Sequence, residues 1–192
     1  MTIVLMWCRS RDDNIIGIGS EIPWDEPEDK DNYAKVVADE VVVMGRKTYE
    51  AMGEEFLNKH KIFVMSNNCD YEVINHNLHK VINKQSDLKD VEDDLYISGG
   101  SYIYEIFLKG KEGFKPHIIV DCVYEGDVLE LVGEKIDVTC CMEVIKNGYR
   151  RITPFYKKGN VKSAIWIKKG DFVEQGVLKK IVKILENGAE IF

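Results

Sequence analysis

One local pattern occurs twice in the chain: an apolar, β-branched run, then glycine, then a segment with helical character. Residues 41–44 read Val-Val-Val-Met and lead into a Gly-Arg-Lys-Thr turn at residues 45–48. Residues 95–98 read Leu-Tyr-Ile-Ser and lead into a Gly-Gly-Ser turn at residues 99–101. Near-continuous apolar runs are typical of strands covered on both faces, and open α/β sheets bind ligands beyond the carboxyl ends of such strands. The repeat therefore predicts an α/β sheet with two ligand-binding turns.

Similar apolar runs recur along the chain with helical segments between them. The predicted strands cover residues 3–7, 41–44, 61–65, 95–98, 118–123 and 164–168. The predicted helices cover residues 29–37, 47–52 and 101–108. This alternation favours a mixed, mostly parallel central sheet flanked by helices and joined by right-handed crossovers.

Beyond about residue 120 the pattern changes. Glycine-containing turns at residues 125–127, 147–148 and 158–160 predict antiparallel hairpins at one edge of the sheet. On this interpretation Cys140 and Cys141 point to opposite faces of a strand.

The chain is divided into a main domain, residues 1–169, and a C-terminal extension, residues 170–192. The extension contains an amphipathic helix that ends at Asn187-Gly188, a typical helix stop. Its apolar face either packs back on the core, which we favour, or forms a dimer contact.

Bulk composition excludes several classes of protein. The formal net charge of −7 argues against a general nucleic-acid binder, although a local basic pocket remains compatible with it. No apolar run reaches the roughly 18 residues that a membrane span needs, and residues 1–7 lack the basic leader of a signal peptide. Five cysteines without a CxxC motif favour reduced thiols and a cytoplasmic location. No metal site is expected, because His76 and His79 lie among asparagines in what we interpret as a polar loop.

The two glycine turns suit a phosphate-bearing ligand. Glycine allows close approach of the backbone, a helix start offers free N–H groups, and Arg46 adds a planar guanidinium fork. Taken alone, each turn is also compatible with an ordinary strand-to-helix connection that carries solvated cations. No GxGxxG fingerprint is present, so a true Rossmann dinucleotide site is not expected.

Asp29 is the acid with the most informative position. It lies six residues after Pro23, on the first turn of a predicted helix that continues through Tyr33. If the side chain faces inward, desolvation raises its pKa, and it can pair with an amidine-like ring edge. The alternative is a solvated helix-cap charge, like the other acids at residues 25–31. One isolated carboxylate and two phosphate-suited turns indicate an anionic nucleotide cofactor beside a substrate with a protonatable ring.

Taken together, these motifs resemble the dihydrofolate reductase family. The resemblance covers roughly residues 1–108 and fades afterwards. It is carried by Ile16-Gly17, Ile22-Pro23-Trp24, Asp29, Tyr33, Met44-Gly45-Arg46-Lys47-Thr48-Tyr49, Gly99-Gly100 and Tyr104. Their order and intervals agree with those of the family, and as a combination they are highly specific.

The resemblance implies the family's fold and NADPH-dependent reduction of 7,8-dihydrofolate to tetrahydrofolate. Nicotinamide C4 would deliver hydride to pterin C6, and N5 would receive a proton. By match, the catalytic residues are Asp29, Trp24 and Ile22, the last on a mobile loop that closes over the nicotinamide. The implied substrate-binding residues are Cys8, Asp29, Tyr33, Met52, Lys59 and Ser98. The implied cofactor-binding residues are Ile16, Gly17, Gly45, Arg46, Lys47, Thr48, Ser66, Gly99, Gly100, Ser101, Tyr102, Ile103 and Tyr104. The family's cis peptide is expected between Gly99 and Gly100.

Three departures from the family pattern affect the substrate side. Lys59 stands where the family has an arginine that clamps the folate carboxylate, which predicts weaker folate binding because lysine lacks the bidentate fork. Ser98 replaces a common aliphatic residue. The threonine that supports the acid is missing, and either Ile118 or Asp121 takes its place. Asp121 there would put a second carboxylate beside Asp29.

Two other functions fit the same scaffold. One is an NADPH-dependent pyrimidine or pteridine reductase, such as the enzyme of riboflavin synthesis, and the other is a non-catalytic folate-binding subunit. The expected partner is dihydrofolate, with no nucleic acid and no membrane. The chain is expected to be a monomer or a weak homodimer through its C-terminal helix.

Overall fold

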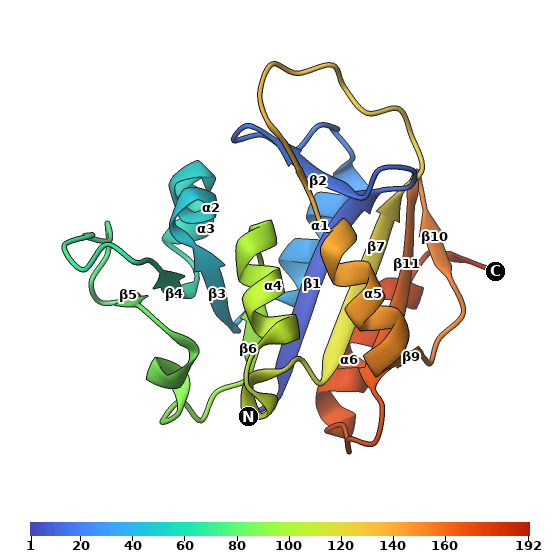
Figure 1. Ribbon diagram of the computed structural model, residues 1–192. Coiled ribbons are helices and arrows are strands. Elements are labelled where there is room, and N and C mark those ends of the chain that lie inside the picture. Colours follow the sequence, from blue (N-terminus) through green and yellow to red (C-terminus); the bar gives the residue numbers. More distant parts are fainter.

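The computed structural model describes residues 1–192, except for the side chain of residue 112. The strands of its large sheet are β1 (Ile3–Ser10), β3 (Val41–Gly45), β4 (Lys61–Met65), β5 (His79–Ile82), β6 (Leu95–Ile97), β7 (Ile118–Tyr124), β9 (Tyr149–Arg151), β10 (Tyr156–Lys158), β11 (Val161–Lys168) and β12 (Glu190–Ile191). They follow the order β12-β10-β11-β7-β1-β6-β3-β4-β5, and β9 also pairs with β11 (Figure 1). A small second sheet pairs β2 (Ile15–Ile18) with β8 (Lys135–Asp137).

The sheet is parallel through its centre and antiparallel at one edge, which confirms the predicted fold class. β1 lies between β6 and β7, and β3 lies between β6 and β4, all in parallel. β11 runs antiparallel to β7 and forms a hairpin with β10. The turn of that hairpin contains Gly159 with φ of 54°, a backbone conformation that glycine adopts without steric cost.

Helices cover both faces of the sheet, so the molecule has three layers with the sheet in the middle (Figure 1). Their bounds are α1 (Pro27–Val36), α2 (Arg46–Ala51), α3 (Glu54–Leu57), α4 (Ser101–Lys109), α5 (Thr139–Gly148) and α6 (Gln175–Glu186), with 3-10 turns η1 (Gln85–Leu88) and η2 (Glu112–Phe114). Residues of α1, α2, α3 and α6 belong to one hydrophobic cluster. Residues of α4 and α5 belong to a second cluster on the opposite face. The central strands therefore lie between two cores, and this explains why their sequences are apolar on both sides.

The prediction of a hairpin at residues 147–148 was wrong. Cys140 and Cys141 lie in helix α5, and Asn147-Gly148 is the end of that helix. The β-branched residues before it resemble a strand, but Val138, Cys141 and Ile145 are buried at helical spacing. Packing of this face on α4 outweighs the weak local preference for a strand.

Residues 125–127 also do not form a tight hairpin. After β7 the chain continues through an irregular segment and returns as β8 to pair with β2. Gly19 N donates to the carbonyl oxygen of Glu134 at 2.9 Å, and Leu129 N donates to that of Pro23 at 2.8 Å. The resemblance implied a mobile loop over residues 16–22, and residues 16–18 of it lie in strand β2, which is held by residues more than one hundred positions later.

Helix α6 turns its apolar face toward the core. Val177, Ile181 and Leu185 are buried, and they join the cluster that contains α1. Glu174 caps the helix by accepting from Gly176 N and Val177 N, each at 2.9 Å. This is the packed arrangement favoured from the sequence. The division into residues 1–169 and 170–192 stays a prediction.

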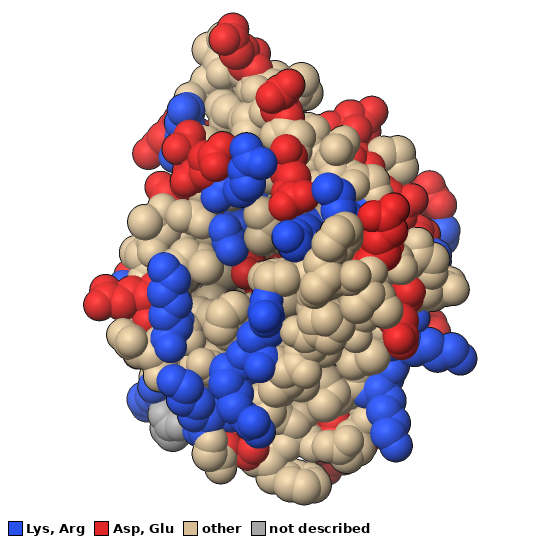
Figure 2. Space-filling model, turned by 90° about the vertical axis from the view of Figure 1, so that its right-hand side faces the viewer, with Lys and Arg blue, Asp and Glu red and all other residues tan. Residues whose placement is uncertain are grey.

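Charge is unevenly distributed over the face shown in Figure 2. One group of lysine and arginine side chains lies on the lower left of that face, while most of the acidic side chains, together with further lysine and arginine side chains, lie above it. The net charge of −7 therefore leaves room for local basic surface. Among the described residues, no helix is long and apolar enough to cross a membrane.

Candidate active site

Asp29 lies on the first turn of α1 and is 8% exposed. Pro27 begins the helix, where its fixed φ and missing N–H cost nothing, and the acid follows two residues later. The indole Nε1 of Trp24 donates a hydrogen bond to Asp29 Oδ2 at 3.0 Å. Burial raises the pKa of the Asp29 carboxyl, and hydrogen bonds from Trp24 and Cys8 oppose part of the rise. The inward-facing interpretation of Asp29 therefore holds in the structure.

Trp24 is itself held firmly. Its ring is 4% exposed and stacks on Tyr124 with a centroid separation of 4.9 Å and an interplanar angle of 17°. Tyr124 was not among the predicted site residues. Because β7 supplies that ring, the position of Trp24 depends on a strand outside the region where the resemblance is strong.

Two thiols, rather than the carboxylate of Asp121, lie beside Asp29. Cys8 on β1 is the register partner of Cys122 on the neighbouring strand β7. Both thiols are near enough to Asp29 for its charge to raise their pKa values further. Burial is the main cause of the rise for both, so both are neutral thiols at physiological pH. Cys122 faces the same side of the sheet as Cys8, and its thiol accepts from the Ser163 hydroxyl at 3.2 Å.

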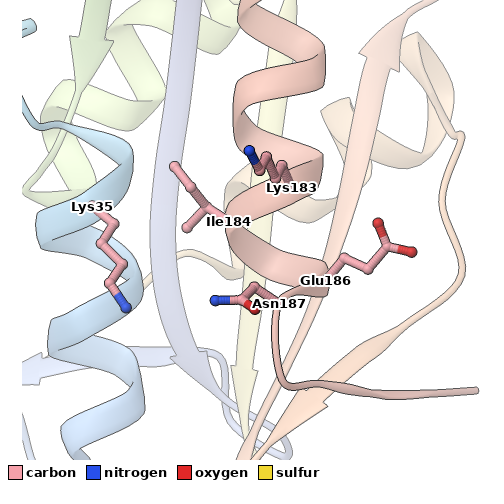
Figure 3. A pocket seen from close by; sticks show the side chains of 5 residues that line it. All are labelled: Lys35, Lys183, Ile184, Glu186 and Asn187. Atoms are coloured by element: carbon pink, nitrogen blue, oxygen red, sulfur yellow. The ribbon is translucent and has the colours of Figure 1, made fainter.

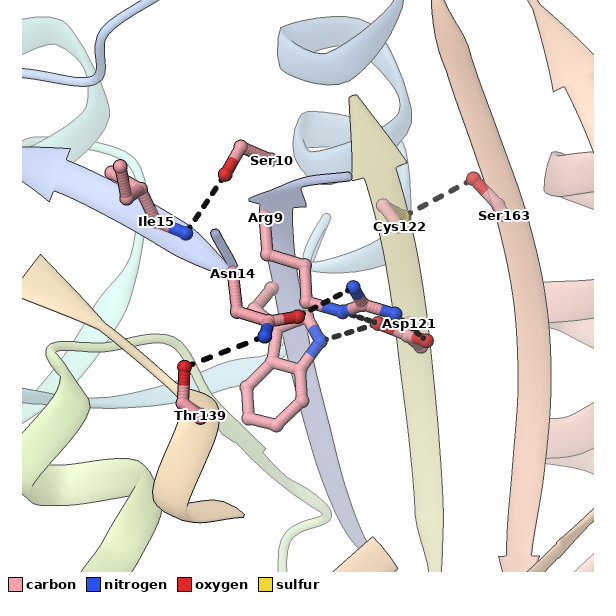
Figure 4. A network of polar contacts seen from close by, with 9 residues as sticks. Arg9, Ser10, Asn14, Ile15, Asp121, Cys122, Thr139 and Ser163 are labelled. Carbon is pink, nitrogen blue, oxygen red and sulfur yellow. Dashed lines mark hydrogen bonds and ion pairs between the residues drawn. The ribbon is translucent and has the colours of Figure 1, made fainter. Parts of the chain in front are cut away.

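Asp121 faces the other side of the sheet, because successive strand residues alternate. Its register partner is Trp7, whose Nε1 donates to Asp121 Oδ1 at 2.7 Å. Arg9 donates to the same carboxylate through Nε at 2.9 Å and Nη2 at 3.0 Å (Figure 4). Placing Asp121 beside Asp29 was thus wrong. Ile118 begins β7 and pairs with Val4, four positions before Cys122.

An aromatic wall lies next to the acid. Tyr33 of α1 stacks on Phe56 at 5.7 Å, and Phe56 stacks on His60 at 3.9 Å. Met52 packs against the same cluster. Tyr33 and Met52 were predicted from the sequence, whereas Phe56 and His60 were not. Their i, i+4 spacing across the end of a short helix is the signal that would have found them.

The Tyr33 hydroxyl is buried and, among the described groups, lacks a hydrogen-bond partner. Burial raises the pKa of Tyr33 to about 12, and the nearby Ser98 hydroxyl opposes part of this rise. Ser98 is buried at the end of β6 and donates weakly to the carbonyl oxygen of Tyr96 at 3.4 Å. Tyr33 and Ser98 therefore bring two hydroxyl groups into largely apolar surroundings.

The two glycine turns lie side by side. Gly45 is the last residue of β3, and Gly99 lies just after β6, the strand that pairs with β3. Gly45 N donates to the carbonyl oxygen of Gly99 at 2.8 Å. The peptide between Gly99 and Gly100 is cis, as the resemblance implied. The side chain of Thr48 lies 3.4 Å from where a Cβ at Gly99 or Gly100 would stand. The turns thus form one surface at the carboxyl edge of the sheet.

The residues that follow the glycines divide into buried and exposed groups. Ile103 is 4% exposed and packs on Gly45, while Tyr102 is 64% exposed. Ser101 begins α4. Arg46 begins α2 and lies 3.7 Å from Glu50, and Lys47 beside it is exposed. Ser66 directly follows the adjacent strand β4 and is 8% exposed.

Tyr104 connects the glycine surface to the acid. Its hydroxyl donates to the carbonyl oxygen of Met6 at 2.8 Å and lies 3.5 Å from the Cβ position of Gly99. Burial raises the Tyr104 pKa well above its ordinary value, and Tyr33 and Asp29 raise it further. The acid, the aromatic wall and the glycine surface therefore meet around one buried tyrosine.

The other predicted site residues lie at the periphery. Ile16 and Gly17 are in β2, and a Cβ at Gly17 would lie 3.3 Å from the Glu21 carbonyl oxygen. Ile22 is 55% exposed. Lys59 is exposed, and its ammonium lies 2.7 Å from Glu55. The structure therefore does not bring Ile22 or Lys59 into the buried group around Asp29.

Comparison with known proteins agrees with this geometry. The family model described as dihydrofolate reductase matches residues 2–129. The dihydrofolate reductase of Enterococcus faecium is 33% identical over 138 residues, which cover 71% of this chain and 80% of the relative. Dihydrofolate reductase HdrB of Haloferax volcanii is 28% identical over 125 residues, or 60% of this chain and 64% of the relative.

A solved structure has the same fold. It is the dihydrofolate reductase from Enterococcus faecalis complexed with NADP(H) and RAB-propyl, with a TM-score of 0.67 and 16% sequence identity. The match covers 88% of this chain and 96% of that one. With the family model spanning the acid, the loop and both glycine turns, the chain belongs to the dihydrofolate reductase family.

Proposed function

We propose that the chain catalyses the NADPH-dependent reduction of 7,8-dihydrofolate to 5,6,7,8-tetrahydrofolate. The observation that carries the proposal is the buried carboxylate of Asp29, whose surroundings reach the glycine surface through Tyr104. A dihydropterin presents a ring N–H and an exocyclic amino group, and a carboxylate can accept a hydrogen bond from each. Asp29 binds that edge, and burial raises the pKa of its carboxyl, which favours the protonated form that can deliver a proton toward N5.

The residues at the carboxyl edge of the sheet fit the family's cofactor. Gly45, Gly99 and Gly100 leave the backbone open to a pyrophosphate, and the start of α4 presents free N–H groups. Arg46 and Ser66 add a guanidinium and a hydroxyl at the ends of adjacent strands. When bound, NADPH supplies the hydride for the pterin carbon. The same edge would hold its nicotinamide against Tyr104 and Ile103.

The chain's own groups bind, orient and shield the substrate. Tyr33 and Phe56 present stacked rings to the flat pterin and its aryl tail, which suits aromatic stacking. Trp24 donates to Asp29 Oδ2 at 3.0 Å, and the Cys8 thiol lies beside the same carboxylate, so both groups restrict its orientation. The segment of residues 16–22 closes the site against water and is held through β8.

The decisive assay follows absorbance at 340 nm with NADPH and dihydrofolate, and identifies the product. Formation of tetrahydrofolate supports the proposal. Cofactor oxidation with a ribosyl pyrimidine substrate, but not with dihydrofolate, would show the pyrimidine reductase instead. Binding of dihydrofolate without any turnover would show a non-catalytic subunit.

Replacement of Lys59 by arginine is expected to lower the KM for dihydrofolate by roughly three- to tenfold, since a guanidinium binds a carboxylate in bidentate fashion. Lys59 is exposed and paired with Glu55, so the substitution needs no repacking. Lys109→Arg is the matched control, because Lys109 has the same i, i+4 pairing with Glu105 at 2.7 Å. An unchanged KM in Lys59→Arg would remove Lys59 from the substrate site.

Substitution of Gly45 by alanine is expected to raise the KM for NADPH by roughly tenfold or more. The new Cβ would lie 3.0 Å from Ile103 Cγ1 and 3.8 Å from Gly100 N, and overpacking of this kind costs about 1–3 kcal/mol. Gly53→Ala is the control, because Gly53 also precedes a short helix in extended conformation and has open space around it. Equal effects of the two substitutions on NADPH binding would contradict the assignment.

A monomer in a cytoplasmic setting completes the proposal. The apolar face of α6 that would serve a dimer is buried within the chain itself. All five cysteines are free thiols, which suits a reducing compartment.

A further inference from the structure

Helix α6 packs directly behind α1, the helix that carries Asp29 and Tyr33. Val36 of α1 and Ile181 of α6 are both fully buried in the same cluster. Near the C-terminal turn of α6, however, the two helices are separated by a hollow of about 410 Å³. Figure 3 shows the residues that line it: Lys35, Lys183, Ile184, Glu186 and Asn187. Apolar packing alone is therefore incomplete at this end of the contact.

A single ammonium group bridges the two helices. Lys158 on β10 donates to Asn32 Oδ1 of α1 at 3.1 Å and to the carbonyl oxygen of Ile184 in α6 at 2.9 Å. Asn32 is 2% exposed and lies one turn after Asp29. The Ile184 carbonyl is one of the last four of its helix, which lack partners within the helix. Lys158 thus satisfies the end of α6 and fixes the middle of α1 with the same group.

A second lysine ties α6 to the end of α1. Lys180 donates to the carbonyl oxygen of Ala38 at 3.2 Å and pairs with Glu40 at 2.6 Å. Ala38 and Glu40 follow the C-terminus of α1 at Val36. Together Lys158 and Lys180 link α6 to the middle of α1 and to the segment just after its end. Helix α6 lies outside the region matched by the family model.

We propose that the C-terminal helix α6 positions the substrate-binding helix α1, with Lys158 as the bridging residue. This rests on the proposed function, in which α1 binds the pterin through Asp29 and contributes Tyr33 to the aromatic wall. A shift of α1 moves both groups relative to the cofactor edge, which is built from other elements. The extension therefore sets the affinity for dihydrofolate and leaves NADPH binding unaffected.

The test compares Lys158→Met with Lys157→Met in the full-length chain. Methionine keeps the apolar stem of lysine and removes the donor. Lys157 is the adjacent residue of β10, is also half-buried, and pairs with Glu125 at 2.9 Å instead of with a helix. Lys158→Met is expected to raise the KM for dihydrofolate by roughly three- to tenfold, because small displacements of substrate-positioning groups are costly. Its KM for NADPH should stay unchanged, and Lys157→Met should change neither value.

Hydrogen exchange provides a readout that needs no activity. In Lys158→Met the amides of α1 should exchange faster, while those of α4, on the opposite face, keep the wild-type rate. Lys158→Arg, which retains a donor, should restore both the KM and the protection. If Lys158→Met does not fold, Lys180→Met provides the same comparison at the second tie.

The outcomes separate this inference from the proposed function. A wild-type chain that does not reduce dihydrofolate overturns the function, whereas faster exchange confined to α1 still supports positioning. An active wild type with the same dihydrofolate KM and α1 exchange in Lys158→Met overturns the positioning role. Equal increases in the KM of both substrates would show a general structural effect and overturn it as well.

Discussion

Asp29→Asn is expected to lower kcat/KM for dihydrofolate by roughly 10²- to 10⁴-fold, the usual contribution of a positioned acid or base. Asparagine keeps the shape of the side chain, and its oxygen can still accept from Trp24 Nε1, which lies 3.0 Å from Asp29 Oδ2. It can neither carry the negative charge that pairs with the pterin edge nor take up and pass on a proton. The loss should therefore fall on chemistry and substrate binding, and leave the KM for NADPH nearly unchanged.

The same substitution is expected to make the folded protein more stable at neutral pH. Burial raises the pKa of Asp29 in the folded state, so folding favours the protonated carboxyl. That preference stabilises the protein at low pH, below the ordinary carboxyl pKa. It is lost as the pH rises through the raised pKa of the folded state, where ionising the desolvated group carries a cost. Asparagine removes this cost, so the stability difference from wild type should grow with pH over this range.

Two measurements check the expectation. Steady-state kinetics against pH should show wild-type kcat/KM falling about tenfold per pH unit above the raised pKa, and this dependence should disappear in Asp29→Asn. Thermal unfolding at several pH values gives the stability difference. Asp31→Asn is the control, because Asp31 is on the same helix, half-exposed, and paired with Lys35. Wild-type activity in Asp29→Asn would disprove the proposed mechanism.

Asp121→Ala is expected to destabilise the folded protein by about 3–5 kcal/mol, the usual cost of removing one partner of a buried ion pair. Arg9 and Asp121 have side chains only 12% and 5% exposed. The substitution leaves the guanidinium without its carboxylate and the Trp7 indole N–H without an acceptor. An uncompensated buried cation is far more costly than the lost attraction alone.

The Asp121 network also anchors the start of the loop over the site. Arg9 Nη1 donates to Asn14 Oδ1 at 2.8 Å (Figure 4). The Asn14 carbonyl oxygen accepts from Val138 N at 3.0 Å. Asn14 has φ of 54°, a conformation that asparagine tolerates better than most residues. Loss of Asp121 should therefore loosen the junction of β1, β2 and β8 in addition to lowering the free energy of unfolding.

Urea unfolding at fixed pH measures the change in Asp121→Ala. Asp12→Ala is the control, because the Arg11–Asp12 pair combines the same residue types at 3.1 Å with 59% and 78% of each side chain exposed. Exposed pairs contribute about 0–1 kcal/mol, so the control should unfold almost as wild type does. The double variant Arg9→Met with Asp121→Leu should recover much of the loss, since apolar replacement of both partners is often neutral. A loss in Asp121→Ala no larger than in Asp12→Ala would show that the pair is not a buried structural element.

Much of the parallel half of the fold follows from local sequence. Residues 61–65 are a strand in both the prediction and the structure, and α4 begins at Ser101 as expected. These segments are apolar on all sides or begin at clear glycine and proline signals, so their state depends little on distant residues. The same is true of the glycine turns, whose backbone requirement is local.

The antiparallel half and the surroundings of the acid depended on distant contacts. Strand β8 has only three residues, Lys135–Asp137, with little strand preference, and it forms because β2 offers a partner. Residue spacing identified Asp29 but did not show that Phe56 stacks on Tyr33. Such neighbours come from different elements, and one sequence holds no record of their distance.

By itself, the amino-acid sequence determined the class of sheet, the two glycine turns and the identity of the candidate acid. Each of these depends on residue type and spacing within one short segment. Only the tertiary structure decided that Cys122, and not Asp121, lies beside Asp29, because a register shift of one residue between β1 and β7 reverses which face each side chain takes. That register is set by burial of both faces at once, a property of the assembled core.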